Sequence, residues 1–184
     1  LPDEVLGQII ERTDGVPVFV EELTKTILES GQLTEEDDRY VAPGPLQDMT
    51  IPATLHDSLM ARLDRLGTVK EVAQTASTIG REFDYHLLEA ISPLSFVELH
   101  NALDQLIDAE LVFRRDQSQE GSYIFKHALV QNAAYGSLLK STRQKLHGRI
   151  AETLLDRFPE QVETRPELLA HHYNAAGLPE NAID

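Results

Sequence analysis

The residues best suited to chemistry stand where a short apolar run meets a helical pattern. His127 follows Tyr123-Ile124-Phe125-Lys126 with no turn residue between them, so we expect its imidazole at the first position of a helix. A ring N–H there would join the exposed backbone N–H groups and the positive helix end, which together favour an anion such as phosphate. Lys126 would add a second cation. The sequence leaves open that His127 only caps its own helix or packs beneath the preceding strands.

His171 and His172 form a second candidate pair. Neighbouring residues on a helix diverge by ~100°, and no carboxylate has ligand spacing to them. We therefore predict exposed or core histidines and no metal site. The sequence also lacks Gly-x-x-x-x-Gly-Lys-Ser/Thr, Gly-x-Ser-x-Gly and His-Glu-x-x-His motifs, so we do not expect this chain to be an enzyme by itself.

Charge distribution says more than the total charge. The 184 residues carry a formal charge of -15 and no cysteine, which disfavours a nucleic-acid or anionic-lipid surface and fits a reducing, cytoplasmic location. Residues 111–150 nevertheless hold seven basic residues and only two acidic ones, Asp116 and Glu120. This basic island comprises Arg114, Arg115, Lys126, Lys140, Arg143, Lys145 and Arg149. Its charge either evens out on folding or forms an anion site. No apolar run is long enough for a membrane span.

The first third of the chain predicts short helices joined by a corner. Apolar residues recur at helical spacing in 3–12 and again in 17–30, with Gly15-Val16-Pro17 between them. Pro17 suits the first turn of a helix, where its missing N–H costs nothing. Residues 32–50 are polar, acidic and rich in proline and glycine, which predicts a long surface loop. The chain starts at Leu1-Pro2 with no initiator methionine, so we expect that its native N-terminus lies upstream.

The middle of the chain predicts helices with recognisable starts. A further helix is expected from Thr54, with Asp57 placed for a reciprocal cap, and capping boxes are expected at Thr68/Glu71 and Ser95/Glu98. Asp84 is placed to cap a short helix before Ser92-Pro93. Residues 111–115 and 123–125 then show a β-rich pattern around a polar loop, which predicts a hairpin.

Three helices followed by a hairpin are typical of a winged-helix domain. The predicted fold class is therefore mainly α, with a winged-helix domain containing a two-stranded β-hairpin. Antiparallel helices are expected after this domain. Near residue 177 the sequence shows a helical pattern, then a Gly-Pro turn, then the start of another helix, which indicates a TPR-like repeat. The expected divisions are a helical lid segment at 1–67, the winged-helix domain at 68–126, and a helical linker with the start of the repeat at 127–184.

Several phrases of the sequence resemble the signalling NTPases of the STAND class. In these proteins a P-loop ATPase core is followed by a helical lid, a winged helix and superhelical repeats. The resemblance rests on residues 13–23, 51–59, 73–83, 125–131 and 168–173, and it is closest to the regulatory regions of bacterial proteins fused to adenylate or guanylate cyclases.

The resemblance implies roles for particular residues. Gly15 and Pro17 match the family's Gly-x-Pro motif in the lid over the adenine. His127 matches the histidine that senses the β-phosphate of ADP. Lys126-His127-Ala128 stands where the family usually has Met-His-Asp, so an acid is replaced by Ala128 and a cation is added at Lys126. The implied cofactor is ATP or ADP, bound only together with an upstream ATPase core, and no metal is implied for this segment.

Three functions follow as hypotheses. The first is a regulatory segment that couples the nucleotide state of an upstream core in the same chain to an effector, expected to be a class III cyclase, with the C-terminal repeats binding protein partners. The second is a winged-helix transcriptional regulator. It ranks behind the first because residues 95–108, the third helix of the winged unit, contain Glu98, Asp104 and Asp108 and no Lys or Arg. The third is a protein-interaction scaffold.

Overall fold

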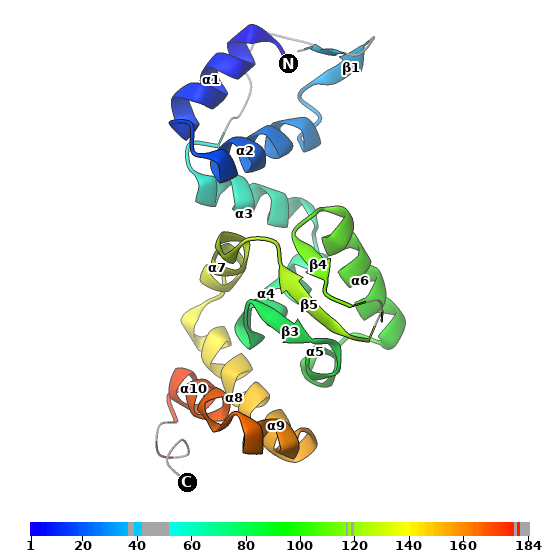
Figure 1. Ribbon diagram of the computed structural model, residues 1–184, viewed down its shortest axis with the longest axis vertical. Helices are drawn as coiled ribbons and strands as arrows, with labels where there is room; N and C mark the ends of the chain where they lie inside the picture. Colours follow the sequence, from blue (N-terminus) through cyan, green and yellow to red (C-terminus); the bar gives the residue numbers. More distant parts are fainter. Residues whose placement is uncertain (37–38, 42–51, 117, 119, 179, 181–184) are drawn as a thin grey trace. The chain divides into compact units, whose positions relative to one another are not determined.

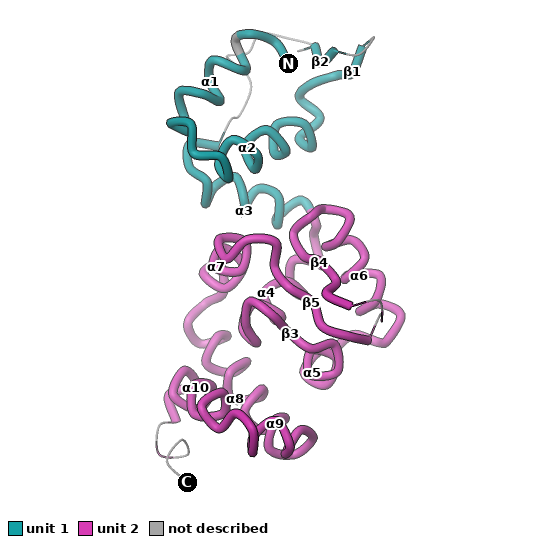
Figure 2. The backbone as a smooth tube through the Cα atoms, in the orientation of Figure 1, with its two compact units in different colours: residues 1–65 teal, residues 66–184 magenta. Residues whose placement is uncertain are grey.

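The computed structural model describes residues 1–36, 39–41, 52–116, 118, 120–178 and 180. They form two compact units, a first unit of residues 1–65 and a second unit of residues 66–184 (Figure 2). The described residues contain ten helices and two small antiparallel sheets, which confirms the mainly α fold with a β-hairpin (Figure 1). The division into three parts stays a prediction.

The first unit is built around two helices joined at the Gly-x-Pro corner. Its elements are α1 (Asp3–Thr13), α2 (Pro17–Glu29), β1 (Thr34–Glu36), β2 (Arg39–Val41) and α3 (Leu55–Arg65). Burial of apolar side chains at helical spacing packs α1 against α2. This core contains Val5, Ile9, Phe19, Leu23, Ile27 and Leu33.

The prediction of a loop over residues 32–50 was wrong at its start. Strands β1 and β2 pair antiparallel, with Thr34 opposite Val41 and Glu36 opposite Arg39. Tyr40 packs on the core of the first unit, and an apolar contact of this kind favours a strand in spite of the acidic composition. Residues 42–51 of the predicted loop lie outside the described residues.

A buried polar network joins α2 to α3. Arg62 forms an ion pair with Glu22, and both side chains are 1% exposed. Arg62 also bonds the carboxylate of Glu29 at 3.1 Å. One turn away, the hydroxyl oxygens of Thr26 and Ser58 lie 2.6 Å apart. Buried charges stay ionised only when they are paired, so this network specifies how α3 meets α2.

The second unit contains a winged-helix arrangement followed by four more helices. Its elements are α4 (Val69–Ile79), β3 (Glu82–Asp84), α5 (Tyr85–Ile91), α6 (Phe96–Asp108), β4 (Val112–Arg114), β5 (Ser122–Phe125), α7 (Ala128–Gly136), α8 (Lys140–Arg157), α9 (Pro159–Thr164) and α10 (Pro166–Ala176). Among the described residues no helix combines the length and apolar character needed to cross a membrane.

The predicted hairpin is present, and a third strand completes its sheet. β4 and β5 pair antiparallel with Val112 opposite Phe125, and β3 pairs with the other edge of β5 through Phe83 opposite Tyr123. The strand order is therefore β3-β5-β4. The sequence analysis missed β3 because three residues are too short to show an alternating pattern.

The predicted caps were right where the first residue keeps an extended backbone. Asp84 accepts hydrogen bonds from the N–H groups of His86 and Leu87, and Ser95 and Glu98 form a capping box. Asp57 N–H donates to the Thr54 hydroxyl oxygen at 3.1 Å. The box at Thr68 was wrong, since Thr68 has a helical backbone and its side chain makes no cap bond. A helical residue cannot aim its oxygen back at the helix start.

Helix α8 connects the winged helix to the C-terminal helices. Its Ile150 and Leu154 are fully buried, and they share one core with Leu87 and Ile91 of α5. Partly buried residues of α9 and α10, including Leu168 and Leu169, complete this core. A continuous apolar core therefore joins the winged helix to the C-terminal helices.

Arg62→Ala should lower the free energy of unfolding by roughly 3–5 kcal/mol, because Glu22 would remain buried without its counter-charge. Arg65→Ala is the matched control. Arg65 pairs with Glu29 at 3.0 Å, but it is 32% exposed, so its removal should cost under about 1 kcal/mol. Urea unfolding followed by circular dichroism measures both losses, and equal losses would contradict the structural role given to the buried pair.

Candidate functional site

The predicted lid residues form a tight corner in the first unit. Asp14 and Gly15 both have left-handed backbones, with φ of 48° and 70°, and Val16 N–H donates to the Thr13 carbonyl at 2.9 Å. Pro17 is the first residue of α2, as its fixed φ predicts. A Cβ at Gly15 would meet nothing within 4 Å. Backbone conformation, and not crowding, is therefore what favours glycine there.

His127 lies at the start of α7 in the second unit. It is the N-cap residue, with an extended backbone, and its carbonyl accepts the N–H of Val130 at 3.0 Å. Its side chain makes no cap hydrogen bond, which overturns the alternative that the ring caps its own helix. The Nε2 atom has no hydrogen-bond partner within the described residues. This atom is buried, so the alternative that the ring packs against the preceding strands stays open, and a ligand could reach Nε2 only if its surroundings moved.

Lys126 is already engaged beside it. Its Nζ pairs with the Glu110 carboxylate at 3.0 Å and lies 5.9 Å from the centre of the Phe113 ring. Its N–H donates to the Leu111 carbonyl at 3.0 Å. These contacts fix the last turn before α7. A ligand that drew on the charge of Lys126 would have to compete with Glu110.

Helix α7 is fastened to α4 near both of its ends. Gln131 donates through Nε2 to the Ser77 carbonyl at 3.1 Å, and Gln74 donates to the Ser137 hydroxyl at 2.8 Å. On the same helix Val130, Ala133 and Ala134 are fully buried. The position of His127 is therefore set by the packing of α7 on α4.

Much of the charge of the basic island is used internally. Arg114 pairs with Asp104 at 3.3 Å and Arg115 pairs with Glu82. Arg143 lies 5.0 Å from the centre of the Tyr135 ring. Two cations of the basic island, Arg114 and Arg115, are thus paired with acids of α6 and β3, which offsets their charge. Exposed ion pairs of this kind contribute little stability.

The two neighbouring histidines have different environments. His171 is exposed and His172 is fully buried, as predicted for surface and core residues. His172 Nδ1 lies 2.8 Å from Nδ1 of His147 on α8, and His147 Nε2 lies 3.0 Å from the Tyr135 hydroxyl. This histidine network links α7, α8 and α10. One nitrogen of the short histidine contact must carry a proton and the other must not.

Burial keeps both rings of the histidine network neutral. Desolvation, reinforced by His171 and Arg143, lowers the pKa of His147 to about 4. Desolvation, reinforced by His147 and His171, lowers the pKa of His172 to about 3. The sequence analysis missed His147, although its spacing from Ile150 and Leu154 places it on the buried face of α8.

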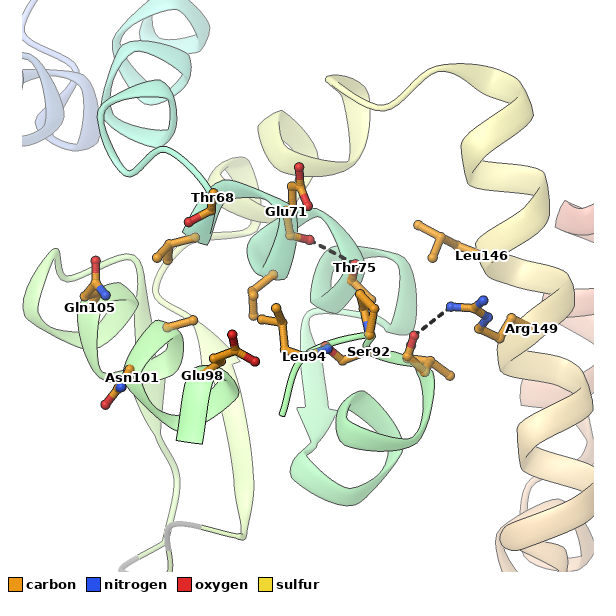
Figure 3. A pocket seen from close by; sticks show the side chains of 15 residues that line it. Thr68, Glu71, Thr75, Ser92, Leu94, Glu98, Asn101, Gln105, Leu146 and Arg149 are labelled. Atoms are coloured by element: carbon orange, nitrogen blue, oxygen red, sulfur yellow. Dashed lines mark hydrogen bonds between the residues drawn. The ribbon is translucent and has the colours of Figure 1, made fainter. Parts of the chain in front are cut away.

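A cavity of about 560 Å³ opens on the second unit (Figure 3). It lies between α4, the turn after α5, α6 and α8, and residues from all four line it. Sequence reasoning did not find this site, because its walls come from segments far apart in the chain.

The second unit has the element order and sheet of a winged helix, with a histidine at the start of the next helix. The chain is 30% identical over 185 residues to an uncharacterized protein of Rhizobium meliloti (strain 1021). That match covers all of this chain and 17% of the relative, so the chain spans about a sixth of the relative's length. No protein-family model and no solved structure matches the chain.

Lowering the pH should destabilise the chain through the histidine network. Both pKa values fall from 6.5 on folding, so the unfolded chain binds protons that the folded chain excludes. The contribution of these histidines to the free energy of unfolding is fully present above about pH 6.5. Towards pH 4 it falls by roughly 1.4 kcal/mol per pH unit for each histidine.

Urea midpoints between pH 7.5 and 5 measure this slope. His172→Phe should flatten it, whereas His86→Gln, at an exposed position of α5, should not. A slope that stays unchanged in His172→Phe would show that other groups carry the pH dependence.

Gly15→Ala should destabilise the first unit by about 1 kcal/mol. At positive φ the Cβ of alanine comes too close to a backbone carbonyl oxygen, which glycine avoids. Gly7 lies inside α1 and also has no atom within 4 Å of an added Cβ. Gly7→Ala should therefore stabilise the chain by about 0.4–1 kcal/mol. Thermal unfolding compares the two, and shifts of the same sign would refute the conformational explanation.

Proposed function

We propose that this chain is the regulatory segment of a multidomain signalling ATPase. It couples the ATP or ADP state of an upstream P-loop core in the same protein to an effector, which the sequence resemblance identifies as a class III nucleotide cyclase. The observation that supports this proposal best is His127. It stands at the N-terminus of α7 directly after β5, and its Nε2 is unpaired within the described residues.

The physical basis is recognition of phosphate by a helix start. The first N–H groups of α7 and a donating imidazole favour the β-phosphate of ADP over a neutral group. The lid corner at Gly15 and Pro17 would cover the adenine, and α7, packed on α4, would report the occupied state to the rest of the second unit. A hinge motion at the lid corner is the conformational step that this function requires.

Two features favour this role over DNA binding. The exposed positions of α6, the helix that would enter the major groove, include Glu98, Asp104 and Asp108, and like charge repels phosphate. The cations of the adjacent strands, Arg114 and Arg115, are paired with acids. Protein partners at α9 and α10 remain part of the proposal, because the sequence pattern near residue 177 resembles the start of a TPR-like repeat.

His127→Ala should weaken ADP binding by about 1.5–3 kcal/mol, the size of a lost charge-assisted hydrogen bond. The measurement is titration calorimetry on a longer form of the protein that includes the ATPase core. His86→Ala, an exposed histidine of the second unit, is the matched control and should leave the affinity unchanged.

Adenosine separates a phosphate contact from a general loss of structure. It lacks phosphate, so His127→Ala should leave adenosine binding as it is. An ADP affinity that does not respond to His127→Ala would make His127 structural and would remove the main support for the proposal. A salt-sensitive shift of labelled duplex DNA would instead favour the transcriptional regulator.

A further inference from the structure

The cavity of the second unit has the size and lining of a ligand site that is independent of His127. Its volume of about 560 Å³ lies within the range of roughly 300–1,000 Å³ found for small-molecule pockets. Figure 3 shows the side chains that line it, which come from α4, the turn at Ser92, α6 and α8. All lining residues belong to the second unit.

The cavity has an apolar floor. Val69 and Val72 of α4 and Ala102 of α6 line it, each 4–6% exposed. Leu94 of the turn and Leu146 of α8, both partly exposed, also line it. Contact with an apolar ring or chain would remove this surface from water, which supplies the main favourable free energy of binding.

The charges at the cavity are unequal. Glu71 of α4 and Glu98 of α6 both line it, against the single cation Arg149. The Arg149 guanidinium donates to the Ile91 carbonyl at 3.0 Å, which ties it to the rim (Figure 3). The Glu71 carboxylate makes no hydrogen bond or ion pair within the described residues. The cavity therefore offers more charged acceptors than charged donors.

Glu98 is held in its ionised form. Its Oε2 accepts hydrogen bonds from the Ser95 hydroxyl at 2.6 Å and from the Ser95 N–H at 2.9 Å. These bonds lower the pKa of the carboxyl group. Both of them end on Oε2, so Oε1 remains as an acceptor, and the amides of Asn101 and Gln105 line the cavity on the same helix.

We propose that this cavity binds a small organic amine, with an apolar body on the valine and alanine floor and an ammonium group at one of the two acidic residues of the rim, Glu71 or Glu98. A protonated amine brings three donors and no acceptor, which matches the acceptors on α4 and α6. A carboxylate or phosphate would meet two like charges there. The acidic chain, with its formal charge of -15, also raises the local concentration of cations.

Three indole compounds with the same ring and two-carbon linker test the proposal: tryptamine, tryptophol and indole-3-propionate. They differ only in a cationic, neutral or anionic end group. Each is titrated into the ¹⁵N-labelled chain, and amide shifts are followed by NMR. Tryptamine should shift the amides of α4 and α6 that line the cavity and bind about threefold tighter than tryptophol, because both carboxylates are exposed. Indole-3-propionate should bind weakest.

Glu71→Gln combined with Glu98→Gln should weaken tryptamine about threefold and leave tryptophol unchanged. Glutamine also serves in a capping box, so α6 keeps its start. Asp156→Asn removes an exposed acid of α8 outside the cavity and should have no effect.

Thr75→Phe, which fills the cavity from α4, should abolish binding of both tryptamine and tryptophol. Equal affinities for the three compounds, shifts outside the cavity, or tryptamine binding that survives the double substitution would each overturn the proposal.

Discussion

The second unit depends on three aromatic side chains buried within its small sheet. Phe83 of β3 stacks on Tyr123 at 5.7 Å between ring centres and lies 5.5 Å from Phe125 of the same strand, β5. All three are at most 1% exposed. Because β5 has a partner strand on each side, its backbone groups are satisfied and its end is fixed. Residues 126 and 127 therefore leave the sheet at a defined point, and α7 begins there.

From this point the structure offers a continuous physical connection to its C-terminal helices. Helix α7 is hydrogen-bonded to α4, and its Tyr135 reaches His147 of α8, which in turn contacts His172 of α10. The apolar side of α8 packs against α5 and the last helices. A displacement of α7 would thus act on polar and apolar contacts together, as the proposed nucleotide switch requires.

Different polar contacts fix the packing of the helices in the two units. The first unit places a buried Arg62–Glu22 ion pair between α2 and α3, where a misplaced helix would leave a charge unpaired. The second unit relies on neutral groups, the histidine network, whose rings stay uncharged because burial disfavours their protonated forms. The buried ion pair penalises wrong packing more than it adds net stability.

The sequence by itself determined the local features: the helices, the hairpin, the caps at Asp84 and Ser95, and Pro17 at the start of α2. Helical spacing, cap chemistry and a fixed proline φ act over a few residues, so they can be predicted without a fold. Only the tertiary structure decided the partners of Glu22, Lys126 and His147, the third strand at Phe83, and the cavity. Those contacts join residues far apart in the chain, and a pattern of charge or apolarity does not say which of many possible partners packing will bring within reach.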